Sequence, residues 1–188
     1  MSRFIDAGAV FAGWIGLGMA VVLVIAFELV IPVQLLVFLL VPLMGVLIGV
    51  YANVRSERWR PRSRVMANAA WAGLVTGLGI AVLYVVLRLV FVYGDTGALP
   101  TGLNLDCRTG PECTYTRYLE AGRSGELERA GITDAASFEA ALLRELAFVG
   151  GALTVLTAGG SLVGGAGRAL SSKGNQDAQG SQELRAAA

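Results

Sequence analysis

Long apolar stretches separated by short polar segments dominate the chain. Residues 7–54 are almost wholly apolar, with Glu28 and Gln34 as the main polar interruptions. One helix of this length would measure about 72 Å, whereas a single membrane span needs only about 20 residues. Two spans joined by a tight turn therefore fit the stretch best, over about residues 10–28 and 33–53.

Two more apolar stretches follow, separated by a long polar segment. The tail, residues 169–188, is rich in Ser, Gln, Gly and Ala without apolar periodicity, and we predict that it is disordered. The pattern as a whole predicts an all-α integral membrane protein with four transmembrane helices. Its expected segments are a hairpin at 1–54, a basic loop at 55–64, a third span at 65–93, a polar segment at 94–145 and a fourth span at 146–168.

The segment between the second and third spans is unusually basic. Residues 55–64 hold five arginines and one glutamate. Short loops rich in Lys and Arg stay on the cytoplasmic side of a membrane, so this loop predicts cytoplasmic N- and C-termini, with residues 94–145 outside. We also expect its arginines to contact lipid head groups. These residues are Arg55, Arg58, Arg60, Arg62 and Arg64.

The two cysteines of the chain, Cys107 and Cys113, lie in the segment assigned to the outside. Disulfides persist outside the cytoplasmic membrane, and the Gly-Pro pair between the cysteines predicts a turn that brings them together. We therefore expect a structural disulfide. The alternative is a redox pair like that of the four-helix bacterial thiol oxidases, whose topology this chain resembles. Those enzymes need a second cysteine pair in the first outer loop, and the corresponding turn at residues 28–34 holds none.

Composition narrows the classes of function. The net charge is +1, so no overall field favours nucleic acid or an acidic substrate. The chain has no histidine, which removes the commonest general base and the usual zinc and haem ligands. We see no motif for a nucleophile, a phosphate loop or a metal cluster, and we expect no catalysis, no metal and no cofactor. Abundant Ala and Gly, with arginine as fourteen of the fifteen basic residues, suggest a bacterial source.

Small residues recur four positions apart in every span, a spacing that lets helix backbones approach closely. The fourth span is the richest, with seven glycines within residues 150–167. We expect this span to have two close-packed faces, one within the chain and one toward a partner. The glycines expected to pack are Gly45 and Gly49, Gly73 and Gly77, and Gly160 and Gly164.

Two ionisable residues, Glu28 and Arg88, lie near the ends of spans and form a possible intramembrane pair. Charges in apolar sequence indicate function by default, but long side chains near a span end can reach the head groups. We expect both residues near the outer interface, as interfacial charges that are either separate or paired.

These patterns favour a non-catalytic accessory, scaffold or assembly subunit in a bacterial cytoplasmic membrane. Its expected partners are membrane lipids and other membrane subunits or a second copy, and nucleic acid is not among them. One alternative is a small oligomeric transporter or channel that uses Glu28 and Arg88. Another is a redox enzyme that depends on the cysteine pair.

Overall fold

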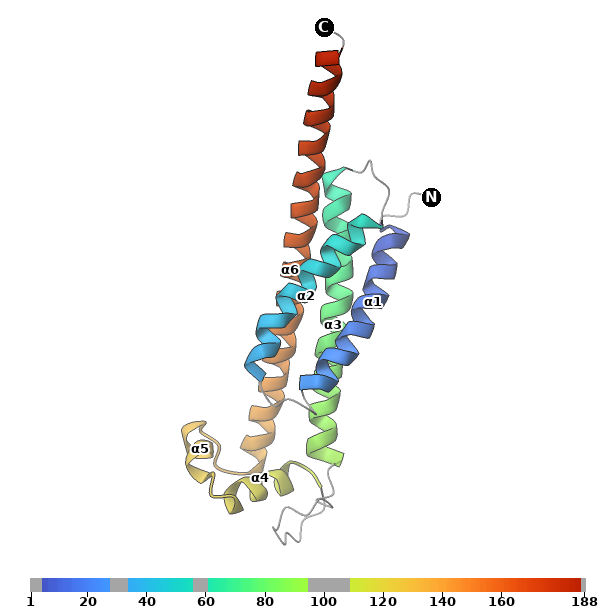
Figure 1. Ribbon diagram of the computed structural model, residues 1–188. Helices are drawn as coiled ribbons and strands as arrows, with labels where there is room; N and C mark the ends of the chain where they lie inside the picture. The colour runs from blue at the N-terminus through green and yellow to red at the C-terminus, as the bar shows by residue number, and fades with distance from the viewer. Residues whose placement is uncertain (1–4, 28–33, 56–60, 95–108, 187–188) are drawn as a thin grey trace. The chain divides into compact units, whose positions relative to one another are not determined.

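A computed structural model of the chain describes residues 5–27, 34–55, 61–94 and 109–186. These residues form helices and connecting turns and include no strand. Four of the helices are long and apolar enough to cross a membrane, which confirms the all-helical prediction with four candidate spans. The helices in Figure 1 are α1 (Ala7–Ile25), α2 (Gln34–Val54), α3 (Arg62–Gly94), α4 (Pro111–Glu120), α5 (Ser124–Arg129) and α6 (Ala135–Ala186).

Two of the long helices have the length of one membrane crossing, and the other two are longer. α1 and α2 have 19 and 21 residues, about 30 Å each, which matches the hydrocarbon core of a bilayer. α3 and α6 have 33 and 52 residues and are therefore longer than one crossing requires. α3 begins three residues earlier than expected, since the Pro61 carbonyl already accepts the amides of Arg64 at 2.9 Å and Val65 at 3.3 Å.

Side chains cap the start of α6. The Asp134 carboxylate accepts the Ser137 amide at 2.7 Å, and the Ser137 hydroxyl accepts the Asp134 amide at 3.0 Å. This reciprocal pair satisfies backbone groups that have no partner within the first turn. The hydrogen bond from the Ser137 amide favours the ionised carboxylate and holds the pKa of Asp134 below its usual value.

The end of α6 differs from the prediction. The helix continues to Ala186, into the segment 169–188 for which the composition predicts disorder. Extending an existing helix needs no new nucleus, and this segment is rich in Ala and Gln, which both favour helix. Composition alone does not include the effect of the long helix that precedes the segment.

The chain divides into two compact units. The first comprises residues 1–81 and 152–188, so it contains α1, α2, the first part of α3 and the later part of α6. The second comprises residues 82–151 and contains α4 and α5, together with the end of α3 and the start of α6.

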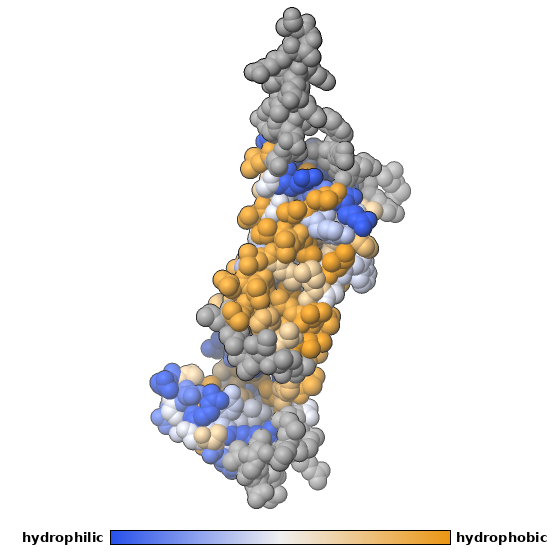
Figure 2. Space-filling model, viewed as in Figure 1, coloured by the Kyte–Doolittle hydropathy of each residue, from blue (hydrophilic) through white to orange (hydrophobic). Residues whose placement is uncertain are grey.

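In the first unit, small side chains are buried and many large apolar ones are exposed. Ala12, Ala52 and Ala69 have no exposed surface, whereas Trp14 and Val22 are each 68% exposed. Hydrophobic residues accordingly cover much of the bundle surface in Figure 2. Lipid-facing bundles have this arrangement, because helices in hydrocarbon associate through close packing and not through hiding large apolar groups.

The second unit has a small aromatic core. The Phe138 ring lies 6.2 Å from the Tyr115 ring and 5.7 Å from the Tyr118 ring, centroid to centroid. Cys113 of α4 and Leu127 of α5 are also buried, with 2% and 5% of their surface exposed. Two short helices of this unit, α4 and α5, supply Tyr115, Tyr118 and Leu127.

Gly110 allows α4 to begin where it does. Its φ of 104° lies in the region that favours glycine, and Pro111 follows as the first helical residue. The Gly-Pro pair therefore marks the bend at which α4 begins, whereas Cys107, which the predicted turn would bring near Cys113, lies outside the described residues.

Candidate functional site: a glycine-lined helix junction

Two glycine pairs from different helices contact the same part of α6. On α2, a Cβ atom at Gly45 would overlap the Thr157 carbonyl oxygen, and one at Gly49 would overlap the Ser161 carbonyl oxygen. The backbones of α2 and α6 are therefore so close that only glycine fits at both positions. Because the atoms that would be struck belong to the α6 backbone, a rotamer change cannot relieve the clash.

α3 meets the same two residues from another side. A Cβ atom at Gly73 would lie 2.5 Å from the Ser161 Cβ, and one at Gly77 would lie 3.1 Å from the Thr157 Cβ. One turn of α6 is therefore held between the glycine pair of α2 and the glycine pair of α3.

The glycines of α6 complete the contact with α2. A Cβ atom at Gly160 would overlap the Pro42 carbonyl oxygen, and one at Gly164 would overlap the Val46 carbonyl oxygen. The six glycines that the sequence singled out thus lie together in one place, which we call the α6 junction. Its members are Gly45 and Gly49 of α2, Gly73 and Gly77 of α3, and Thr157, Gly160, Ser161 and Gly164 of α6.

Hydroxyl groups add hydrogen bonds to this close packing. The Ser161 hydroxyl donates to the Ala69 carbonyl of α3 at 2.6 Å, and the Thr157 hydroxyl donates to the Leu153 carbonyl within α6 at 2.7 Å. Both side chains have no exposed surface. A bond of this kind between membrane helices contributes about 0.6 kcal/mol on average and up to about 1.7 kcal/mol.

α1 joins the bundle through its own glycine contact with α3. A Cβ atom at Gly16 would overlap the Thr76 hydroxyl, and Thr76 has no exposed surface. On α3, a Cβ atom at Gly79 would in turn overlap the end of the Leu17 side chain.

A buried polar contact ties the start of α1 to α3, and the sequence analysis did not identify it. The Asn68 side-chain amide donates to the Asp6 carboxylate at 2.7 Å, and the Asp6 backbone amide donates to the Asn68 side-chain oxygen at 3.1 Å. Asp6 is 7% exposed and Asn68 is fully buried. An asparagine inside an apolar span was the available signal, since such residues commonly bond across helices.

An exposed stripe of α6 in the first unit carries a second set of glycines. Gly159 and Gly167 are exposed, and a Cβ atom at either would meet nothing within 4 Å. Exposed Val and Leu side chains alternate with these glycines every three or four residues, so that large and absent side chains alternate along one stripe. We call this stripe the outer face of α6, and it consists of Val155, Gly159, Val163, Gly167 and Leu170.

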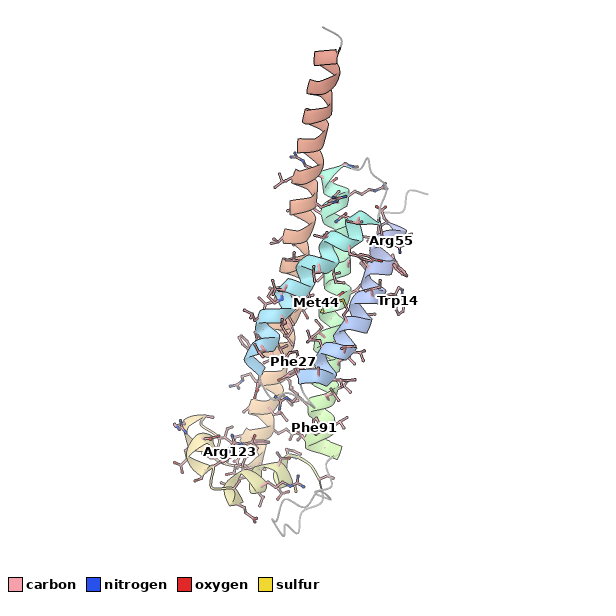
Figure 3. All side chains as sticks on the ribbon, viewed as in Figure 1. Trp14, Phe27, Met44, Arg55, Phe91 and Arg123 are labelled. Carbon is pink, nitrogen blue, oxygen red and sulfur yellow. The ribbon has the colours of Figure 1, made fainter. Side chains whose placement is uncertain are left out.

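The basic loop is described in part. The Arg55 guanidinium lies 5.2 Å from the centre of the Phe11 ring and 6.0 Å from that of Tyr51, so it bridges α1 and α2. Figure 3 labels Arg55 at the end of α2. Arg62 and Arg64 lie in the first turn of α3, whereas Arg58 and Arg60 lie outside the described residues.

Arg168 of α6 lies at the same end of the bundle as these arginines. A Cβ atom at Gly165, one turn before Arg168, would lie 3.7 Å from the Val65 carbonyl oxygen. Val65 directly follows Arg64 in the chain, so this contact places Arg168 near the start of α3, where Arg62 and Arg64 lie.

The predicted charge pair and the predicted disulfide each fall partly outside the described residues. Arg88 is half-buried on α3 with its guanidinium 5.5 Å from the centre of the Tyr84 ring, but Glu28 is not described. Cys113 is buried on α4, but Cys107 is not described. Both pairings therefore stay predictions.

Polar contacts stabilise the second unit at its surface. The Arg123 guanidinium bonds the Glu126 carboxylate at 2.6 Å and lies 4.6 Å from the centre of the Tyr118 ring. This hydrogen bond holds the pKa of Glu126 below its usual value. The Tyr93 hydroxyl donates to the Glu139 carboxylate, which links the end of α3 to the start of α6.

The described residues thus define a helical protein with four segments able to cross a membrane. Within them, no group of three or more Cys, Asp or Glu side chains is placed to hold a metal ion. Comparison with family models, with curated proteins and with solved structures finds no match for this chain. Function must therefore be argued from the packing surfaces.

Proposed function

We propose that this chain is a non-catalytic subunit of a bacterial membrane complex, where it acts in assembly or as a scaffold. The outer face of α6 is the observation that carries the proposal. In this proposal, a transmembrane helix of another subunit packs along that face.

The argument rests on what the glycines of α6 do. Glycine in a helix interior is less favourable than alanine by about 1 kcal/mol. At Gly160 and Gly164 the close approach of α2 accounts for glycine. At Gly159 and Gly167 nothing within the chain does, since a Cβ atom there would stand in open space. A second helix, with its backbone close to these two glycines and its side chains between Val155 and Val163, would account for both.

We further propose that the bundle sits with both termini in the cytoplasm. The support is that Arg55, Arg62, Arg64 and Arg168 gather at one end of the first unit. Basic residues near span ends are retained on the cytoplasmic side, and they can contact anionic lipid there.

The second unit would then face the outside of the cytoplasmic membrane, where disulfides persist. We propose that Cys107 and Cys113 form such a bond. The buried position of Cys113 on α4 supports a structural role, because a buried sulfur is shielded from exchange with other thiols.

Isolation of the full chain from its own membrane in a mild detergent tests the proposed assembly. We expect stoichiometric co-purification with other membrane proteins, identified by mass spectrometry. Gly159→Trp should abolish the association because the side chain fills the gap between Val155 and Val163.

Leu78→Trp is the control, since Leu78 of α3 is also exposed, at 55%, but belongs to another helix. This control should leave the association intact. A homo-oligomer that survives Gly159→Trp would contradict the proposal and favour the small transporter or channel. A monomer would contradict both.

A further inference from the structure

Two arginines, Arg62 and Arg168, lie on the faces by which α3 and α6 contact each other. In that contact the Ser161 hydroxyl donates to the Ala69 carbonyl, and a Cβ atom at Gly165 would lie 2.6 Å from the Ala69 Cβ. Arg62 precedes Ala69 by seven residues, and Arg168 follows Ser161 by seven residues. Seven residues return to within about 20° of the same helix face. Each arginine therefore continues the face that its helix turns toward the other.

The two arginines also lie at the same level of the bundle. α3 and α6 run in opposite directions, and their contacts pair Ala69 with Ser161 and Val65 with Gly165. Figure 1 shows the start of α3 beside α6, which continues past it. One further turn in this antiparallel register brings Arg62 opposite Arg168.

No described carboxylate bonds either arginine. Both side chains are exposed, and neither forms an ion pair. The one carboxylate among the described side chains of the first unit belongs to Asp6, which accepts a hydrogen bond from Asn68. The first turn of α3 contains no acidic residue, although the positive end of the helix dipole lies there. Two guanidinium groups and a helix N-terminus thus bring positive charge together, and an anion between them would be stabilised.

The position of this pair along the helices identifies the anion. The candidate spans of α3 and α6 begin at Arg62 and end at Leu170, so the pair lies at the limit of the apolar segments, where lipid phosphates lie. Guanidinium groups match the geometry of phosphate oxygens, and basic pockets between membrane helices hold anionic head groups. We infer that Arg62 and Arg168 together bind the phosphate of one anionic lipid. This inference rests on the membrane placement in the proposed function, but not on assembly through the outer face of α6.

Native mass spectrometry of the full chain in neutral detergent micelles tests the inference. Phosphatidylglycerol and phosphatidylcholine with the same acyl chains are added in equal amounts, and the lipid that stays bound to each chain is counted. We expect one phosphatidylglycerol, retained several-fold better than phosphatidylcholine, whose choline group neutralises its phosphate. Arg62→Gln and Arg168→Gln should each weaken this binding about fivefold, because an arginine near an anionic lipid contributes about 1 kcal/mol.

Arg55→Gln is the matched control. It removes the same charge from the same end of the bundle, but the Arg55 guanidinium lies over the Phe11 and Tyr51 rings and belongs to α2. All three arginines are exposed, and glutamine is a good helix former, so the fold should persist. We expect Arg55→Gln to leave lipid binding nearly unchanged.

Three results would overturn the inference. Equal losses in Arg55→Gln and Arg62→Gln would show that the lipid responds only to total charge. Equal retention of both lipids by the unsubstituted chain would show that no anionic site exists. Displacement of the lipid by an equal concentration of inorganic phosphate would assign the site to a free phosphate compound. Each measurement uses the isolated chain, so none of these results bears on the co-purification that tests the assembly.

Discussion

Replacing single glycines of α6 by alanine tests the α6 junction most directly. In Gly160→Ala the new methyl group would overlap the Pro42 carbonyl oxygen and lie 3.0 Å from the Pro42 carbonyl carbon. In Gly159→Ala, one residue earlier, it would meet nothing within 4 Å. The two substitutions are chemically identical and adjacent, and they differ only in which face of α6 receives the methyl group.

The size of the effect follows from this comparison. Alanine is favoured over glycine in a helix by about 1 kcal/mol, but this gain is common to both variants and cancels in their difference. What is left is the overpacking term, about 1–3 kcal/mol when a close-packed site must move apart. We expect a value in the upper half of that range, because the obstructing atoms belong to the α2 backbone and cannot rotate away.

The assay is the free energy of unfolding of the full chain in detergent micelles, measured by circular dichroism during titration with a denaturing detergent. A second pair serves as an internal repeat. Gly164→Ala would overlap the Val46 carbonyl oxygen, whereas Gly167→Ala would meet nothing. If both members of each pair unfold at the same free energy, α2 and α6 are not in close contact and the α6 junction is wrong.

Three further predictions concern single polar groups. Asn68→Leu should destabilise the chain by about 1.5–3 kcal/mol in the same unfolding assay, because the buried Asp6 carboxylate loses a hydrogen bond; an unchanged free energy would contradict this. Ser161→Ala should cost only about 0.6 kcal/mol and at most about 1.7 kcal/mol, so a larger loss would mean that more than one bond is broken. Because the pKa of Asp134 is lowered in the folded state, its stabilising effect should be complete above about pH 4 and disappear as the pH falls through the lowered pKa. Amide-exchange protection at Ser137 should therefore decline at acidic pH in the native chain but not in Asp134→Asn, and a decline in both would point to a different titrating group.

The four long apolar helices could be predicted from sequence because each depends on a property that is local in the chain. A run of about 20 apolar residues spans a bilayer only as a helix, since every backbone group must bond within its own segment. The start of α6 was predictable for the same reason, because Asp134 and Ser137 lie within one turn.

The end of α6 and the Asp6 contact could not be predicted in this way. The helix beyond residue 168 extends the long helix that precedes it, and the composition of residues 169–188 alone carries no information on that preceding helix. Asp6 and Asn68 are 62 residues apart in sequence, and the pattern gives no reason to pair them. Asp6 also occupies a capping position, yet its side chain makes no cap bond and binds α3 instead.

Glycine illustrates most clearly where sequence reasoning stops. The spacing in Gly160 and Gly164 correctly marks a face able to approach another helix, but spacing does not say whose helix it is. Gly159 and Gly167 are the same residue type and lie close by in the chain, yet a Cβ atom at either would meet nothing within 4 Å. The two sets are distinguished only by what a Cβ atom would meet. At Gly160 and Gly164 it would strike the α2 backbone, whereas at Gly159 and Gly167 it would meet nothing in the described structure. A helix that needed glycine for its own fold alone could carry alanine at both outward positions and gain stability, so the outward pair is where selection for an external contact should be sought.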